Sequence, residues 1–346
     1  MVVYENLIKG FCGQGISICF AAYLYLSGYI DNNCWLFTKL CTFFILLIIA
    51  NSIIIVVRGA KKGGTTPFLK IFIVSLTEVL INAFMLLAID RASLYYVVAI
   101  SQLGFPISVV YKKYIRKEKE DITLYKLLAF IFIIVFCFFI SYFSYGNLKI
   151  TFLATLFVLL SNITITIDLY LQFQILQNYD VNYYSVVMAA FAIPITLVVS
   201  FIVDKKNAQM PIELFKYYTK HWMPIIGFGA ALTLVYAVSP FFIKKYSPIS
   251  FQASLLSNNC YIGLCFILVS MDKTYFKRLI KSGAFFTKDS FKRFDKIFYI
   301  LLYLICLGSS FYLTYSTEHR IKKIEKEQIE KIEEEQKKDL KIEVKE

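Results

Sequence analysis

Several motifs that mark soluble enzymes are missing from this chain. It has only two histidines, His221 and His319, and neither has another candidate ligand or base close by in the sequence. The HExxH and GxSxG motifs are absent, as are the GxGxxG and GxxxxGK[ST] loops that cradle phosphates. The sequence therefore argues against a zinc hydrolase, a serine hydrolase and a nucleotide-binding loop, and no cofactor or metal is expected.

The cysteines do not form a recognisable framework either. All eight are scattered, no CxxC or CxxxC pair occurs, and nearly all lie within apolar runs: Cys12, Cys19, Cys34, Cys41, Cys137, Cys260, Cys265 and Cys306. Zinc sites and disulfide scaffolds both depend on regular cysteine spacing. Neither is indicated here.

Apolar residues, in contrast, are in excess. They make up 58% of the 346 residues, against about 45–50% in a typical soluble domain. They fall in runs of roughly 20, long enough to cross a bilayer as a helix, and helices satisfy their own backbone in lipid. The pattern predicts an all-α integral membrane protein with ten transmembrane helices, at residues 10–30, 35–57, 68–89, 92–111, 124–144, 151–175, 183–203, 222–242, 250–270 and 297–315.

Basic residues are placed as membrane topology requires. The net charge of +13 does not indicate a nucleic-acid partner, because Lys and Arg lie in short loops between spans. Lys9, loop 58–62 and loop 112–119 share one side, which predicts a cytosolic N-terminus and, with ten spans, a cytosolic C-terminus. The basic loops 204–221 and 271–296 fall on the opposite side. Either one span is miscounted, or residues 271–296 form an amphipathic surface helix. Plasma and internal membranes both remain open.

Two segments of the chain, about half its length apart, resemble each other. The predicted spans 92–111 and 250–270 both begin with small polar residues. Each then carries a polar cluster, at Ser101-Gln102 and at Ser257-Asn258-Asn259. Five spans separate them, and an odd number inverts the second copy, as in many transporters. We therefore expect two inverted five-helix repeats, at residues 1–148 and 149–316, followed by a charged cytosolic tail at 317–346; chance similarity is the alternative.

Two acids lie inside predicted spans. Glu78 and Asp168 would each cost about 2.5–3.5 kcal/mol as a charge at mid-bilayer, so such residues usually mark an ion or substrate path. Asn82 and Gln172, one turn away on each helix, extend the two polar stripes. Burial favours the protonated acid, which suits proton coupling. The alternative is a neutral acid that joins two helices by hydrogen bonds.

Charge inside the spans also limits the solute and the function. No Lys or Arg lies deep in a span, whereas an anionic solute would need a buried cation. A neutral or cationic small molecule is favoured. A membrane enzyme would need paired acids, and the sequence offers two that look isolated. An enzyme and a non-transporting scaffold remain the alternatives to a transporter, and a homodimer is left open.

Specific residues add a family resemblance. The stretch LVYAVSPFFIKKYSPISFQASLLSNNCYI resembles the F branch of solute carrier family 35, in the drug/metabolite transporter superfamily. The matching residues are Tyr236, Pro240, Ile243, Lys244, Ser247, Ser250, Leu256 and Tyr261. GQGISICF looks like the first-span GQxxS motif of that branch, through Gln14 and Ser17, and Asn82, Gly104 and Pro106 fall at its spacing. The resemblance covers residues 10–315 and implies ten helices in two inverted repeats, cytosolic termini and alternating access without a cofactor.

The chain also departs from that branch. The family often has Glu where this sequence has Leu80, and Ser101 and Asn259 replace acids expected in the fourth and ninth spans. The substrate is therefore not carried over; a nucleoside-like solute is one candidate and a nucleotide sugar is the alternative.

From these arguments we expect a central cavity between the repeats. Glu78 is the expected proton- or cation-binding acid, and Pro106 and Pro240 are expected to let their helices bend. The predicted lining residues are Gln14, Glu78, Asn82, Ser101, Gln102, Asp168, Gln172, Tyr236, Gln252, Asn258 and Asn259.

Overall fold

The fold is known from a computed structural model. It describes residues 2–29, 36–59, 67–92, 94–117, 152–203, 211–258, 260–262 and 296–316, with a few positions between 124 and 135. Over these ranges the secondary structure is helical and no strand occurs. The helices are α1 Val2–Tyr29, α2 Leu36–Arg58, α3 Phe68–Ile89, α4 Leu94–Ser101, α5 Gly104–Val110, the π-helix η1 Tyr111–Ile115, α7 Phe152–Asn178, α8 Val181–Val203, α9 Pro211–Lys245, α10 Pro248–Leu255 and α13 Lys296–Ser316.

Six of these helices contain apolar stretches long enough to cross a membrane. The stretches belong to α1, α2, α3, α7, α8 and α9, and α13 adds a shorter one at Leu304–Tyr315. Large apolar side chains such as Val56, Leu69 and Phe201 are exposed, as expected where a helix faces lipid rather than water. The chain is an all-α membrane protein. Most of the predicted span 124–144 and the second half of span 250–270 lie outside the described residues.

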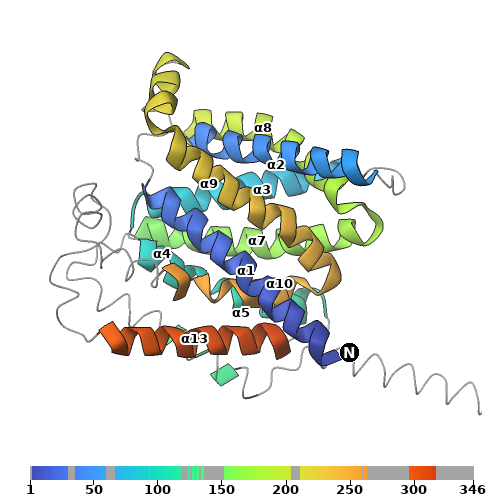
Figure 1. Ribbon diagram of the computed structural model, residues 1–346, viewed down its shortest axis with the longest axis vertical. Helices are drawn as coiled ribbons and strands as arrows, with labels where there is room; N and C mark the ends of the chain where they lie inside the picture. Colours follow the sequence, from blue (N-terminus) through green and yellow to red (C-terminus); the bar gives the residue numbers. More distant parts are fainter. Residues whose placement is uncertain are drawn as a thin grey trace, which may run out of the picture.

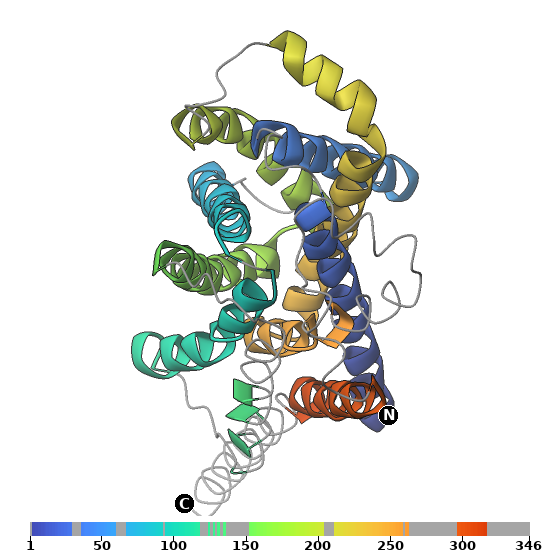
Figure 2. The same ribbon diagram turned by 90° about the vertical axis from the view of Figure 1, so that its left-hand side faces the viewer.

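The helices form one bundle, in which segments far apart in the chain are neighbours. α2 packs on α8 at one end, α3 lies between α7 and α8, and α1 crosses α9 (Figure 1). α10 lies between α1, α5 and α13 at the other end, which is seen from the side in Figure 2. The elements that meet at the bundle centre are therefore α1, α3, α7, α9 and the short helices α4, α5 and α10.

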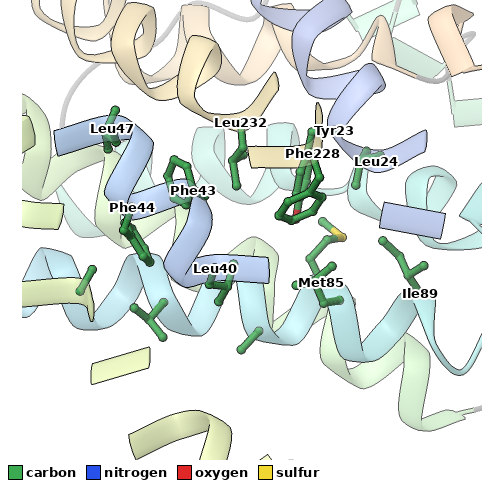
Figure 3. Packing of buried hydrophobic residues seen from close by; sticks show 14 of the residues in the cluster. Tyr23, Leu24, Leu40, Phe43, Phe44, Leu47, Met85, Ile89, Phe228 and Leu232 are labelled. Atoms are coloured by element: carbon green, nitrogen blue, oxygen red, sulfur yellow. The ribbon is translucent and has the colours of Figure 1, made fainter. Parts of the chain in front are cut away.

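An aromatic cluster fixes one side of this centre. Figure 3 shows Tyr23 of α1 and Phe228 of α9 meeting near Met85 of α3, with ring centroids 5.0 Å apart for Tyr23 and Phe228. Phe43 of α2 lies 4.9 Å from the ring of Tyr236. Lipid supplies little hydrophobic drive between helices, so close packing of this kind holds them together. It also sets where the hydroxyls of Tyr23 and Tyr236 can reach.

The predicted span 92–111 is not one bent helix. α4 ends at Ser101 and α5 begins at Gly104; the turn between them is closed by Leu103 N to Ile100 O (3.0 Å) and Phe105 N to Gln102 O (3.3 Å). Pro106 is the third residue of α5, where its missing N–H costs no helical hydrogen bond. The sequence predicts a helix bend near Pro106. The structure instead interrupts the helix close to that position, at residues 102–103.

The second polar segment contains a similar turn. α10 starts at the N-cap Ser247, whose Oγ accepts from Ser250 N at 3.1 Å, and Pro248 follows in the first helical position. The helix ends at Leu255, and Leu256 N and Ser257 N bond to the carbonyls three residues earlier, at 3.3 and 3.4 Å. Helical backbone then resumes at Asn258.

One other expectation needs correction. Residues 204–221 were predicted as a loop, but α9 begins at Pro211. Proline is favoured in the first turn of a helix, so the helix can start there and run on. Pro240 lies inside α9, which runs on to Lys245, and the expected bend at Pro240 stays a prediction. Loop 271–296 (apart from Lys296, the first residue of α13) and tail 317–346 lie outside the described residues.

Candidate functional site

A small cavity lies where the short helices meet the long ones. Its volume is about 40 Å³, room for a few waters and far below the roughly 300–1,000 Å³ of a typical small-molecule pocket. Among the residues that the structure describes, no Asp, Glu, Lys or Arg lines it. The lining residues are Phe20, Tyr23, Ile81, Asn82, Met85, Ser101, Gln102, Phe105, Ser161, Asn162, Ile165, Tyr236, Gln252, Leu255, Leu256 and Asn258.

The two broken segments reach the cavity because a glycine lets them approach. A Cβ atom on Gly104 would lie 3.2 Å from Gln252 Oε1 and 3.3 Å from Asn162 Oδ1. Asn162 of α7 in turn donates to the carbonyl of Ile100 at 3.2 Å, at the end of α4. Gly104 therefore brings α5, α7 and α10 together. Gln102 enters the cavity from the turn between α4 and α5, and Gln252 enters it from α10.

Two amide atoms in the lining have no hydrogen-bond partner. Gln102 donates through Nε2 to the carbonyl of Val98 at 3.2 Å, but its Oε1 accepts from no group. Gln252 has an unpartnered Nε2. Both side chains are buried, at 2% and 4% exposure. Buried polar atoms are nearly always paired, so this free acceptor and free donor are positions for water or for a polar solute.

Next to the cavity, the two intramembrane acids meet. Gln172 Nε2 donates to Glu78 Oε1 and to Asp168 Oδ2, each at 2.6 Å. Tyr236 donates to the other oxygen of Glu78, and Thr77 donates to the other oxygen of Asp168 at 2.5 Å. Because one nitrogen bonds both acids, the two carboxyl groups lie side by side. We call these two residues the acid pair.

The expectation of two isolated acids is therefore wrong. Glu78 is on α3 and Asp168 is on α7, and the packing of these helices brings the two side chains together. Both are buried, at 3% and 1% exposure. The sequence shows each polar stripe but not which stripes face each other, because that depends on how the helices pack.

Tyr236 connects the acid pair to the cavity. It lines the cavity and donates to Glu78, while its hydroxyl oxygen accepts from Asn82 Nδ2 at 3.2 Å. Asn82 Oδ1 accepts from the Tyr23 hydroxyl at 3.4 Å. Tyr236 and Asn82 thus form a polar wall. Glu78, Asp168 and Gln172, expected in the lining, lie behind that wall.

The remaining predicted residues have different positions. Ser101, Gln102, Gln252 and Asn258 line the cavity. Gln14 does not; its Oε1 accepts from Tyr261 at 2.7 Å.

The neighbouring Ser17 of α1 holds the second broken segment. Its hydroxyl donates to Asn258 and accepts from Ser257 at 2.8 Å. Gln14 and Ser17 therefore tie α1 to the segment after α10. Asn259 lies outside the described residues.

The expected lining omitted four polar residues of this region. Tyr23, Ser161 and Asn162 line the cavity, and Thr77 bonds to Asp168. A polar residue such as Asn162 in mid-span is a usable signal, because lipid disfavours it. Tyr23 and Thr77 are common in membrane helices and give no such signal.

Comparisons with known proteins bear on the fold alone. A scan against protein-family models gives no match, and a search of curated proteins finds no relative. Twenty-six chains of solved structures match. One of them, described only as the crystal structure of a protein, aligns with a TM-score of 0.61 and 9% identity over 92% of this chain and 99% of that chain. Fold and site together define a multi-pass all-α membrane protein with a buried polar centre.

Proposed function

We propose that this chain is a secondary transporter that moves a small organic solute across a membrane by alternating access. The observation that carries the proposal is the uncharged polar cavity enclosed between two interrupted helical segments at the bundle centre. Irregular backbone at membrane depth is tolerated where it lines a cavity. In transporters, interrupted helices of this kind build the substrate site.

The proposal includes ten spans in two inverted five-helix repeats. Support comes from the matched turns at Gln102-Leu103 and Leu256-Ser257, half a chain apart, which both use bonds to the carbonyl three residues earlier. The resemblance to the F branch of solute carrier family 35 supports the same architecture. Four of its matched residues, Asn82, Gly104, Tyr236 and Leu256, line the cavity or lie beside it.

The solute we propose is neutral and polar. The described lining residues offer amides, hydroxyls and aromatic rings, and none of them is a cation that could hold a nucleotide sugar. The free Gln102 Oε1 and Gln252 Nε2 offer one acceptor and one donor, and a nucleoside-like molecule could use both. A solute of that size needs more than about 40 Å³, so the cavity must widen in another state, as alternating access requires.

Glu78 is proposed as the acid that binds a proton or cation during the cycle. It is buried at the bundle centre and contacts the cavity wall through Tyr236. Glu78→Gln should weaken transport while the protein still reaches its membrane, because the amide keeps the shape and loses the charge. Uptake by this variant that stays equal to wild type across pH would refute the role of Glu78.

The transport function is tested with purified protein in liposomes. Uptake is measured for a panel of radiolabelled nucleosides, nucleotide sugars and organic cations, with empty liposomes as the control. We expect protein-dependent entry of an unaltered neutral solute. Conversion of a substrate without net movement would indicate a membrane enzyme. Absence of both movement and conversion would favour a scaffold. Either result contradicts the proposal.

A further inference from the structure

All four oxygens of the acid pair already accept a hydrogen bond from a neutral group. Gln172 serves one oxygen of each acid through its two amide hydrogens, Tyr236 serves Glu78, and Thr77 serves Asp168. Within the described part of the chain, no Lys, Arg or His pairs with either carboxyl. The pair is thus well supplied with dipoles and has no counter-charge.

Two adjoining carboxylates without a cation are costly inside a membrane. Like charges a few ångströms apart repel strongly when the surroundings are poorly polarisable, and two acids that share a site therefore keep a proton between them. Gln172 Nε2 donates to one oxygen of each acid at 2.6 Å, which places those two oxygens within a few ångströms of each other.

Tyr184 belongs to α8, which packs on α3. It is fully buried, and its hydroxyl has no hydrogen-bond partner among the described residues. It therefore makes no hydrogen bond with either acid.

The other described residues packed around the pair form no hydrogen bond or ion pair that brings a charge to it. Tyr236 comes from α9, and α5 and α10 have no ionisable residue. The ionisable residues in the buried part of α2, Lys39 and Cys41, make no hydrogen bond or ion pair with either acid. In α4, Tyr96 pairs with Thr155.

We propose that Glu78 and Asp168 form a single proton-binding site that holds one shared proton, and that Tyr236 transmits the loss of this proton to the cavity wall. Release leaves two carboxylates and one proton on water. The Tyr236 hydroxyl is then drawn more strongly to Glu78, which changes its bond with Asn82 in the lining. The transport meaning of this step rests on the function proposed above; the site itself does not.

The test is a pH titration of the full-length protein in liposomes, in which infrared difference spectroscopy monitors the carboxyl groups at each pH. We expect the carboxyl bands of the wild type to change in two separate protonation steps, because coupled acids titrate as a unit. Glu78→Gln and Asp168→Asn should each leave one protonation step and remove the band change that the two acids share. Asp90→Asn, at the end of α3, is the matched control and should keep both steps.

The role of Tyr236 has its own signature in the same experiment. A tyrosine band that is lost in Tyr236→Phe should change together with a carboxyl step. Two acids that titrate independently of each other, or a Tyr236 band that stays constant throughout, would overturn the proposal. A response of the carboxyl bands to Na⁺ at constant pH, absent with a bulky organic cation, would also overturn it, because the site would then bind a metal cation.

This titration needs no solute, so its failure differs from failure of the transport function. If the pair titrates as a unit but no solute enters liposomes, the proton site stands and the transporter proposal falls. If a solute enters while the acids titrate independently, the transporter stands and the shared proton falls.

Discussion

The acid pair and the cavity lie on opposite sides of Tyr236, and they treat their polar atoms differently. Every carboxyl oxygen of the acid pair has a donor, whereas the cavity leaves Gln102 Oε1 and Gln252 Nε2 unpartnered. A buried site with all its bonds made is built to hold a charge or a proton in place. A site with unpartnered donors and acceptors suits the binding of a molecule. Gln172 bonds to the acid pair and Gln252 lines the cavity, so a Gln→Met substitution can be compared between the two regions.

The largest effect is expected at Gln172. Gln172→Met keeps the length of the side chain but removes the donor shared by both acids, and should lower the free energy of unfolding by about 3 kcal/mol, since hydrogen bonds to charged groups are the strong ones. Thermal unfolding in detergent micelles measures it. A variant as stable as the wild type would show that the acid pair does not depend on its donors.

A somewhat smaller loss is expected where the broken helices meet. Gly104→Leu places a side chain against Gln252 and Asn162 and should cost about 2 kcal/mol by overpacking. Gly15→Leu is the matched control, because no atom lies within 4 Å of a Cβ at that position. Equal unfolding temperatures for the two variants would contradict the close packing described at Gly104.

Tyr236→Phe should cost less again, about 1.5 kcal/mol, because one hydrogen bond to Glu78 and one from Asn82 are lost. Its control is Tyr261→Phe, which loses a bond to Gln14 away from the acid pair. The unfolding temperature should fall further for Tyr236→Phe. The reverse order would mean that the link to Glu78 contributes little.

The smallest effect on stability is expected in the cavity. Gln252→Met should change the free energy of unfolding by less than about 0.5 kcal/mol, since the atom removed has no partner. Affinity for the solute proposed above should fall about tenfold, the value of one hydrogen bond. Apparent affinity in the liposome assay measures this. A stability loss equal to that of Gln172→Met would erase the contrast between the two regions.

Much of this arrangement follows from the sequence. The long apolar runs predict the spanning helices, and polar residues inside them predict the centre of the bundle, because lipid disfavours them. Ser101, Gln102 and Asn258 were found in this way, and they line the cavity. Helix boundaries were less certain, as the start of α9 at Pro211 illustrates.

The acid pair could not be predicted, for a physical reason. Glu78 and Asp168 are separated by 90 residues, and their contact depends on the rotation of α3 and α7 about their axes and on how these helices pack. A single sequence gives the face of each helix but not its partner. Tyr236 was found through a family resemblance, whereas its role as the link between pair and cavity is visible only in three dimensions.

The central claim is that the proton on the acid pair controls what the cavity does, and proton-driven accumulation tests it most directly. Wild type, Asp168→Asn and Glu78→Gln are each reconstituted into liposomes, and a pH gradient is imposed across the membrane. Accumulation of a radiolabelled nucleoside is then measured over time. We expect the wild type to concentrate the solute only when the gradient is present, and both variants to exchange it without concentrating it. Gradient-driven accumulation by either variant at the wild-type level would contradict the account.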